Sequence, residues 1–569
     1  MKRSIVFCVF AAFGGWLFGY DIGYISGCLI MPDFIHQIQG VDATAITSQN
    51  QSIITSLLSA GTFFGAILQA FTSDRLGRKG SILFWSAIFF VGVIVQVTTF
   101  SLGQLTAGRF VAGLGVGALS AIVPLYIGEA APKKLRGSLL VLYQVQIISG
   151  LFLAYIINLG THHINNSASW RIPIGLQLVW GIMLMGGSLL LPESPRLLLG
   201  KGKVDQAIKA IAALNDCGVD DKLTRDLMRE LQVAIEAENE GGKAGWLECF
   251  STRSRMWKRT LNGCMVQMLQ QLNGQNFYYY YGPVFFEAAG TGLDSYSIQA
   301  ILGGISLFMV FPAMWTIEHV GRRKSLLIGS LGQAVCAIIA GLVGHFYTDT
   351  EGVSDSTRQV GGNVMIAFAV FHLAFYSMFW GPTPWVLMGE TFPLRVRSKC
   401  IALAAATNWL WNFLLSYFSP LIADDIGPLI LLVFCGCLIF AFVYVYFMIP
   451  ETRGISLEEV DELYRTKVPA WRSNSWVPSS HHANIDEEGV RRHSESTFVA
   501  NGLGSEQEKK ITQQHVENAK PNEKLPRLQI RMGLFVEQHS NDTEKRSQYE
   551  QKRLKLEDKN NTRTIRNRP

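Results

Sequence analysis

The sequence predicts an all-α polytopic membrane protein with twelve transmembrane helices arranged as two six-helix halves. The chain of 569 residues is 49% hydrophobic and only 17% charged, and its mean hydropathy is +0.21. That average combines apolar blocks, which alternate with short polar links, and one long polar C-terminal segment. Each block has the roughly twenty residues that a helix needs to cross a hydrocarbon core, and lipid cannot satisfy an open sheet edge.

The apolar blocks define the predicted elements in chain order. The first six spans fall near residues 5–30, 51–73, 81–100, 103–128, 137–160 and 170–191. Six more follow near 260–288, 297–318, 325–347, 363–388, 399–422 and 428–449. The predicted domains are therefore an N-terminal half (1–191), a helical loop (192–259), a C-terminal half (260–464) and a polar, disordered tail (465–569).

Positive charge in the loops predicts the orientation. Lys and Arg gather in alternate loops, at Arg75, Arg78 and Lys79, at Lys133, Lys134 and Arg136, at Arg322, Arg323 and Lys324, and at Arg395, Arg397 and Lys399. The positive-inside rule places these loops, both termini and the 192–259 loop in the cytoplasm of a cell whose plasma membrane the chain spans. Asn165, in the sequence Asn165-Asn166-Ser167, then faces outside and is a candidate glycosylation site.

Composition argues against several other classes of protein. The net charge of +6 is distributed over separate loops, so no nucleic-acid partner is expected. The nine cysteines are scattered, with no paired CxxC and no matching histidine cluster, so neither a metal site nor a disulfide framework is predicted. No nucleophile and base stand out within the spans, which makes an enzyme the weakest class, and no cofactor is expected.

Asp21 lies near the middle of the first apolar run and requires an explanation. An aspartate at mid-membrane is unfavourable by about 2.5–3.5 kcal/mol, so the default interpretation is a functional site with a partner or a wet cavity nearby. The alternative is an acid at the water interface, where the helix frays.

The two halves repeat the same motifs. Residues 74–79 after the second span and 318–323 after the eighth each contain an acid, a two-residue step, then Gly and a basic pair. Each half ends in Pro-Glu, at Glu193 and Glu451. The pairs Glu129 with Arg136 and Glu390 with Arg397 keep the same separation. Three echoes in register indicate a duplicated six-helix unit with its substrate site between the halves.

At these motifs the chain resembles the major facilitator superfamily and, within it, the sugar porter family, over roughly residues 10–465. The carrying motifs are Gly108–Phe110 with Pro124–Glu129, Gln270–Asn276, and Pro450–Gly454, while Trp170–Gln177 resembles fungal-type members. The resemblance implies the major facilitator fold, alternating access, transport of a monosaccharide such as glucose, and function as a monomer.

Most candidate sugar ligands lie in four spans, and Phe18 lies in a fifth. Gln270, Gln271 and Asn276 place amides in hydrocarbon, where they need a wet cavity or a partner; interhelical amide packing is the alternative. These amides match the family's sugar-binding positions, as does Gln144. Aromatic plates and further amides are supplied by Trp385 beside two prolines, by Asn408, Trp409 and Asn412, and by Phe18 at the cavity floor. For Trp385 and Trp409 ordinary packing is the alternative.

Two positions depart from the family pattern and leave the preferred sugar open. Ser306 stands where many relatives carry an asparagine ligand, and Ser377 where mammalian-type facilitators carry a glutamate. A serine hydroxyl still binds a sugar, but it reaches less far.

Two groups of residues are predicted to gate the cavity. Tyr280 and Tyr281 belong to an aromatic run that resembles an external lid. At the cytoplasmic side, ion pairs that form when the inside is closed would stabilise the outward-open state. The residues of this cytoplasmic gating group are Asp74, Arg75, Arg78, Glu129, Arg136 and Glu193 in one half, and Glu318, Arg322, Arg323, Glu390, Arg397 and Glu451 in the other. The positive-inside rule alone would explain the basic residues of this group, but it does not explain the acidic residues paired with them.

Asp21 with Arg109 is the candidate proton-coupling pair, because an apolar cavity favours the neutral acid and a guanidinium favours the carboxylate. Proton-coupled symport is therefore predicted. A proton-independent facilitator remains open, and so does a transporter-like sugar sensor that signals through its tail.

Overall fold

The computed structural model describes residues 2–131, 136–239, 245–252, 255–288, 293–349, 354–393, 396–455 and 457–477. All regular elements in these ranges are helices. Nine helical stretches within them are long and apolar enough to cross a membrane. The expectation of an all-α polytopic membrane protein is confirmed at this level.

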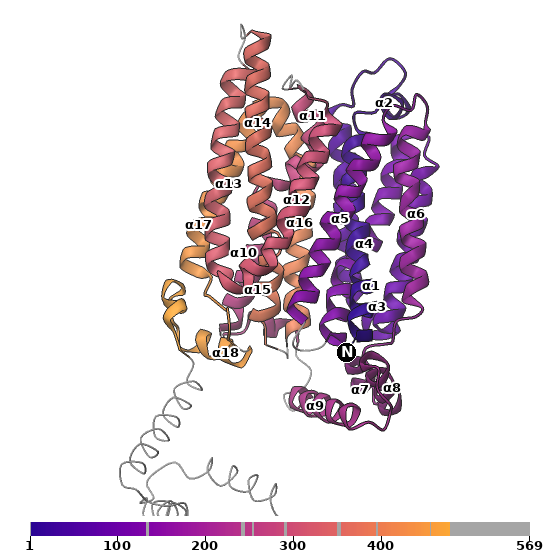
Figure 1. The fold of residues 1–569 in the computed structure, drawn as a ribbon, viewed down its shortest axis with the longest axis vertical. Helices are drawn as coiled ribbons and strands as arrows, with labels where there is room; N and C mark the ends of the chain where they lie inside the picture. The colour runs from indigo at the N-terminus through magenta and orange to yellow at the C-terminus, as the bar shows by residue number, and fades with distance from the viewer. Residues whose placement is uncertain are drawn as a thin grey trace, which may run out of the picture. The chain divides into compact units, whose positions relative to one another are not determined.

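The first group of helices corresponds closely to the first six apolar blocks (Figure 1). Its members are α1 (Lys2–Cys28), the short α2 (Pro32–Gln39), α3 (Ser48–Val97), α4 (Leu102–Ala130), α5 (Arg136–Thr161) and α6 (Ala168–Ser188). The 50-residue α3 is interrupted at Gly77, whose φ of 87° lies outside the helical region and favours glycine. The second and third predicted spans are thus two arms of one helical stretch.

Close approach of α1 to α5 depends on glycine. A methyl group on Gly19 would overlap the backbone carbonyl of Ile147, and one on Gly150 would overlap the carbonyl of Trp16. Small residues let helix backbones approach in a membrane, where association depends on packing rather than on the hydrophobic effect.

Short helices follow the first group. They are α7 (Pro195–Gly200), α8 (Val204–Asn215), α9 (Lys222–Asn239) and the 3-10 helix η2 (Trp246–Phe250). Buried side chains of α7, α8 and α9, including Leu198, Ile211 and Met228, form a small core of their own. Figure 1 shows α7 to α9 and α18 at the same end of the bundle as the N-terminus. This end is called the basic end below, and the end that carries α2 is called the opposite end.

The second group repeats the arrangement with more interruptions. Its members are α10 (Met256–Gln271), α11 (Gln275–Ala288), α12 (Ser295–His319), α13 (Arg322–Gly344), the π-helical turn η4 (His345–Asp349), α14 (Asp355–Phe375), the π-helical turn η5 (Tyr376–Trp380), α15 (Thr383–Thr391), α16 (Arg397–Ile426), η6 (Gly427–Leu429) and α17 (Ile430–Met448). Gly274, with φ 91°, separates α10 from α11. Gly381 and Pro382 separate η5 from α15, and Pro384 lies in the first turn of α15, where the N–H that proline lacks is not needed.

The ordered structure extends past the predicted start of the tail at residue 465. Two further elements, α18 (Leu457–Arg465) and η7 (Ala470–Ser475), follow α17, and Ser473 Oγ accepts a hydrogen bond of 2.8 Å from the Glu451 N–H. Residues 466–477, which the sequence assigns to the tail, therefore contact the body of the protein. Residues 478–569 lie outside the described ranges, so a truncation that tests the tail should begin there.

Candidate functional site

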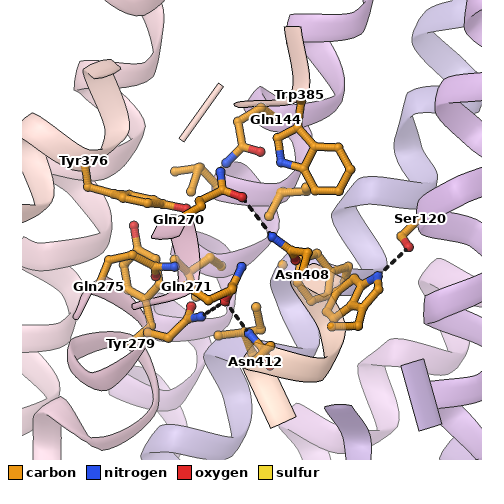
Figure 2. A pocket seen from close by; sticks show the side chains of 18 of the residues that line it. Ser120, Gln144, Gln270, Gln271, Gln275, Tyr279, Tyr376, Trp385, Asn408 and Asn412 are labelled. Carbon is orange, nitrogen blue, oxygen red and sulfur yellow. Dashed lines mark hydrogen bonds between the residues drawn. The ribbon is translucent and has the colours of Figure 1, made fainter. Parts of the chain in front are cut away.

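A cavity of about 60 Å³ lies between the two groups of helices (Figure 2). Its lining comes from α1, α4 and α5 on one side and from α10, α11, η5, α15 and α16 on the other. The lining residues are Phe18, Gly19, Ile22, Ser120, Tyr143, Gln144, Ile147, Ile148, Leu151, Gln270, Gln271, Gln275, Asn276, Tyr279, Tyr376, Trp385, Asn408, Trp409 and Asn412. Amides, tyrosines and indoles thus face one small space.

Gln270 is positioned by the break between η5 and α15. Its Nε2 donates to the backbone carbonyls of Trp380 (2.9 Å) and Gly381 (2.8 Å). The Trp380 carbonyl would ordinarily accept from the residue four positions later, which is Pro384 and has no N–H. The side chain of Gln270 therefore takes up an acceptor that the proline leaves vacant, and its Oε1 accepts from Asn408 Nδ2 at 3.0 Å.

Gln271 lies at the centre of a second amide network. Its Oε1 accepts from Asn412 Nδ2 at 2.9 Å and from the Asn276 side chain. Asn412 Oδ1 in turn accepts from Ser59 Oγ at 2.5 Å, which joins α16 to α3. Amides on both sides of the Gly274 break and on α16 are thus held in one orientation, with their remaining donors and acceptors available to a polar ligand.

Aromatic rings form the apolar part of the lining. The Phe18 and Trp409 rings meet edge to face with centroids 4.9 Å apart, and Trp409 Nε1 donates to Ser120 Oγ at 3.2 Å. This contact joins α1 and α4 to α16, with Trp385 on a further side of the cavity (Figure 2). An apolar ring face beside amide groups suits a polyhydroxylated ring.

Nine of the ten predicted sugar ligands line this cavity, from four separate spans and Phe18. Ser306 is the exception. Its hydroxyl accepts from Tyr279 Oη at 3.1 Å, so it contacts a lining residue rather than the cavity. Tyr143, Gln275 and Tyr376 also line the cavity, and the sequence did not predict them as lining residues. Tyr376 precedes the Gly381-Pro382 break by about one turn, and that proximity is the signal that could have found it.

The structure brings Asp21 and Arg109 together in the first group. Both side chains are fully buried, and Arg109 Nη2 lies 3.6 Å from Asp21 Oδ2. The guanidinium is fixed by two more bonds, from Nε to the Ile54 carbonyl (2.6 Å) and from Nη1 to Tyr24 Oη (2.7 Å). Neither oxygen of Asp21 has a hydrogen bond to any described residue. Asp21 and Arg109 do not line the cavity, although Gly19 and Ile22 of the same helix as Asp21 do.

Toward the opposite end, Tyr280 and Tyr281 bond to α16 of their own group, and Tyr281 and Gln299 contact the first group. Tyr281 Oη contacts the Thr55 hydroxyl and donates to the Ser416 carbonyl at 2.6 Å. Tyr280 Oη donates to Asn412 Oδ1 at 3.4 Å. Beyond them, Gln299 Nε2 donates to Ser26 Oγ at 2.6 Å. Both predicted gating tyrosines are thus buried where the groups meet. Asn165, the candidate glycosylation site, is exposed between α5 and α6.

At the basic end the first group carries a compact ion network. Arg78 donates from Nε and Nη2 to the two oxygens of Glu129, each at 2.9 Å. Glu193 Oε1 accepts from the Arg78 backbone N–H at 2.9 Å. A side chain at Gly77 would collide with the Glu193 carboxylate, so glycine is needed there for this bond as well as for its φ. Asp74 is exposed, 3.8 Å from Arg78.

The second group repeats this network almost atom for atom. Arg322 donates to the two oxygens of Glu390 at 2.9 and 2.5 Å, and Glu451 Oε1 accepts from the Arg322 N–H at 2.8 Å. A side chain at Gly321 would meet the Glu451 carboxylate. In both networks the Arg–Glu pair joins helices of the same group.

The remaining predicted gating residues have different surroundings. Arg323 Nη2 donates to the Tyr446 carbonyl at 2.9 Å, and the Arg397 guanidinium donates to the Gly389 carbonyl. Arg75 and Glu318 are exposed. The side chain of Arg136 lies outside the part of the chain that the structure describes.

A helical bundle with a polar cavity between two repeated groups of helices has the architecture of a membrane carrier rather than of an enzyme. Comparison with known proteins agrees. The family model described as "Sugar (and other) transporter" matches residues 7–464. The chain therefore belongs to the sugar transporter family.

Individual relatives and solved structures are similar over most of the chain. A galactose transporter of Saccharomyces cerevisiae is 39% identical over 481 residues, 84% of each chain. A low-affinity glucose transporter of Kluyveromyces lactis is 38% identical over 83% of this chain and 84% of its own. The proton:xylose symporter XylE, solved with 6-bromo-6-deoxy-D-glucose, superposes with a TM-score of 0.65 and 25% identity, covering 81% of this chain and 99% of its own. The match to XylE supports the major facilitator fold.

Proposed function

We propose that this protein transports a monosaccharide, a hexose such as glucose, across the plasma membrane by alternating access, as a proton symporter. The observation that carries the proposal is the cavity between the groups, where oriented amides face two indoles. The names of the relatives point to the same substrate class, galactose and glucose.

Twelve crossings in two halves account for the helices. Two of the nine apolar stretches, 48–97 and 399–448, have 50 residues each. At 1.5 Å per residue such a stretch is about 75 Å long, more than two crossings of a ~30 Å core. Adding α10 with α11, which together are long enough for one span, gives twelve. The positive-inside rule then puts the basic end in the cytoplasm and Asn165 outside.

Alternating access follows from where the halves touch. The contact of Tyr281 in α11 with Thr55 in α3 joins the halves and closes the cavity toward the outside, while the Arg78–Glu129 and Arg322–Glu390 pairs brace each half at the inside. Breaking the tyrosine contacts lets the halves part outward, and each braced half moves as a unit.

The test of this function is uptake of labelled glucose, galactose, fructose and xylose in cells that lack their own hexose transporters, with and without a protonophore. Uptake of at least one sugar, reduced by the protonophore, is expected. If none of the sugars enters cells that display the protein at their surface, the proposal is wrong. Uptake that the protonophore does not change would indicate a proton-independent facilitator instead of a symporter.

Gln271→Ala is expected to raise the KM for sugar about tenfold, since it removes one ligand and frees the side chains of Asn276 and Asn412, at roughly 1–1.5 kcal/mol for the lost hydrogen bonds. Initial uptake rates over a range of sugar concentrations measure it. Gln206→Ala, at an exposed position in α8, is the control for the loss of a glutamine and should leave KM unchanged. An unaltered KM in Gln271→Ala would place the sugar elsewhere.

Asp21→Asn is expected to keep sugar exchange and to lose accumulation against a gradient, because the amide preserves shape but carries no exchangeable charge next to Arg109. Counterflow of labelled sugar in proteoliposomes reports exchange, and uptake driven by an imposed proton gradient reports coupling. Uphill uptake that persists in this variant, also at alkaline outside pH, would remove Asp21 from the coupling step.

A further inference from the structure

A second cavity, remote from the first, lies at the basic end, where the start of α10 meets the end of α17 and the link after α18. Its volume is about 600 Å³. Four cationic side chains line it, Arg255, Lys258, Arg465 and Lys467, together with Trp257 and Met448. It is called the basic pocket below.

The described lining of the basic pocket carries an excess of positive charge. No acidic side chain is among the lining residues that the structure describes. The neighbouring Asp461 is shared, since it accepts from Arg465 Nε at 2.6 Å and from Arg259 Nη2 at 2.8 Å. Arg255 also repels the partly buried Lys258. Cations crowded in this way are stabilised by a bound anion.

The backbone of the pocket is held in an uncommon conformation. Arg255 and Lys467 have φ of 53° and 59°, and they are two of the three non-glycine residues with positive φ in the described ranges. This left-handed region is sterically unfavourable for side chains larger than hydrogen, and such residues gather at ligand sites. Both strained residues aim a cation at the same space.

Aromatic residues place the basic pocket at the level of the membrane surface. Met448 is the last residue of α17, and the preceding Tyr446 and Phe447 are exposed and pack on the exposed Trp471. Trp257, 44% exposed, lines the pocket itself. Exposed tryptophan and tyrosine rings at the end of a spanning helix mark the interface with lipid headgroups.

We propose that the basic pocket binds the phosphorylated headgroup of an anionic membrane lipid, with an acyl chain along Trp257 and Met448. A basic recess at headgroup depth on the cytoplasmic side, where anionic lipids are concentrated, meets this ligand at high local concentration. The apolar side chains of Trp257 and Met448 can contact the acyl chain of a lipid, whereas a free phosphate has no apolar part to contact them. This inference rests on the membrane orientation above and is independent of which sugar is carried.

The test uses the full-length protein in nanodiscs of phosphatidylcholine containing about 10% phosphatidylinositol 4,5-bisphosphate, an anionic lipid of the class expected at this face. Native mass spectrometry, or displacement of a fluorescent phosphoinositide, measures the bound lipid. Replacing Arg255, Lys258 and Lys467 together by Gln is expected to weaken binding about 100-fold, at roughly fivefold for each neutralised charge near an anionic surface. Arg465 is kept because it holds Asp461.

The matched control removes three other cations from the same end of the protein. Lys203, Lys209 and Lys222 are exposed on or beside α8 and α9, and replacing them by Gln should leave phosphoinositide binding within about twofold. Equal binding by the pocket variant and the wild type, or an equal loss in the control, would overturn the proposal. So would inositol trisphosphate, without acyl chains, that competes as well as the intact lipid. Thermal unfolding of both variants confirms that each is folded.

Discussion

Arg109→Gln is expected to destabilise the protein by about 3–5 kcal/mol, the cost of leaving a buried charge without its partner. Asp21 is fully buried, its nearest guanidinium atom is Arg109 Nη2 at 3.6 Å, and neither of its oxygens has a hydrogen bond among the described residues. The substitution also removes the bonds that tie α4 to Ile54 and Tyr24. Sugar uptake should be lost along with surface expression.

A double-mutant cycle separates the effect of the unpaired buried charge from the effect of the changed side-chain shape. Asp21→Asn combined with Arg109→Gln leaves no buried charge, so the double variant should unfold at a higher temperature than Arg109→Gln alone. Thermal unfolding of the four purified proteins in the same detergent measures the coupling. If the effects of the two substitutions on stability simply add, the two side chains do not interact. That result would contradict the proposal that Asp21 and Arg109 form the coupling pair.

Gly19→Ala is expected to have the second large effect, a loss of stability of about 3 kcal/mol or more. The added methyl group would overlap the Ile147 carbonyl, a backbone atom of α5 that cannot turn aside as a side chain can. The helices must separate, and the separation moves Phe18 and Ile22, which line the cavity from α1.

Gly160→Ala, at a position of α5 where a methyl group meets nothing within 4 Å, is the matched control. It should be neutral or stabilising by about 0.5–1 kcal/mol, since alanine favours a helix over glycine. The measurement is the midpoint of thermal unfolding by size-exclusion fluorescence. A Gly19→Ala midpoint equal to that of Gly160→Ala would show that α1 and α5 lie further apart than described.

Several features could be predicted from the sequence because they are periodic or chemically costly. Apolar block length predicted the spans, since only a helix of about twenty residues satisfies its backbone in lipid. The isolated acid at Asp21 predicted a buried partner, and the partner named, Arg109, lies beside it. The repeated motifs predicted matching networks in the two halves, and Glu193 and Glu451 occupy equivalent places over Gly77 and Gly321.

Other features depend on how distant segments meet. Nothing in the local pattern shows that Gln270 completes the backbone of η5, that Ser306 reaches only the hydroxyl of Tyr279, or that Tyr376 faces the cavity. The polar segment η7 is ordered by its contacts, here Ser473 with Glu451, and local composition does not show such contacts.

By itself the sequence determined the class of protein, the candidate spans and most of the side chains in the cavity, because hydrocarbon sets a strict requirement on length and on every polar group within it. Only the tertiary structure decided which amides hold one another and which face the cavity. It also brought Arg255 and Lys467, 212 residues apart in the chain, to a single basic pocket. Such pairings follow from helix packing and from breaks at Gly274, Gly381 and Pro382, which local composition does not encode.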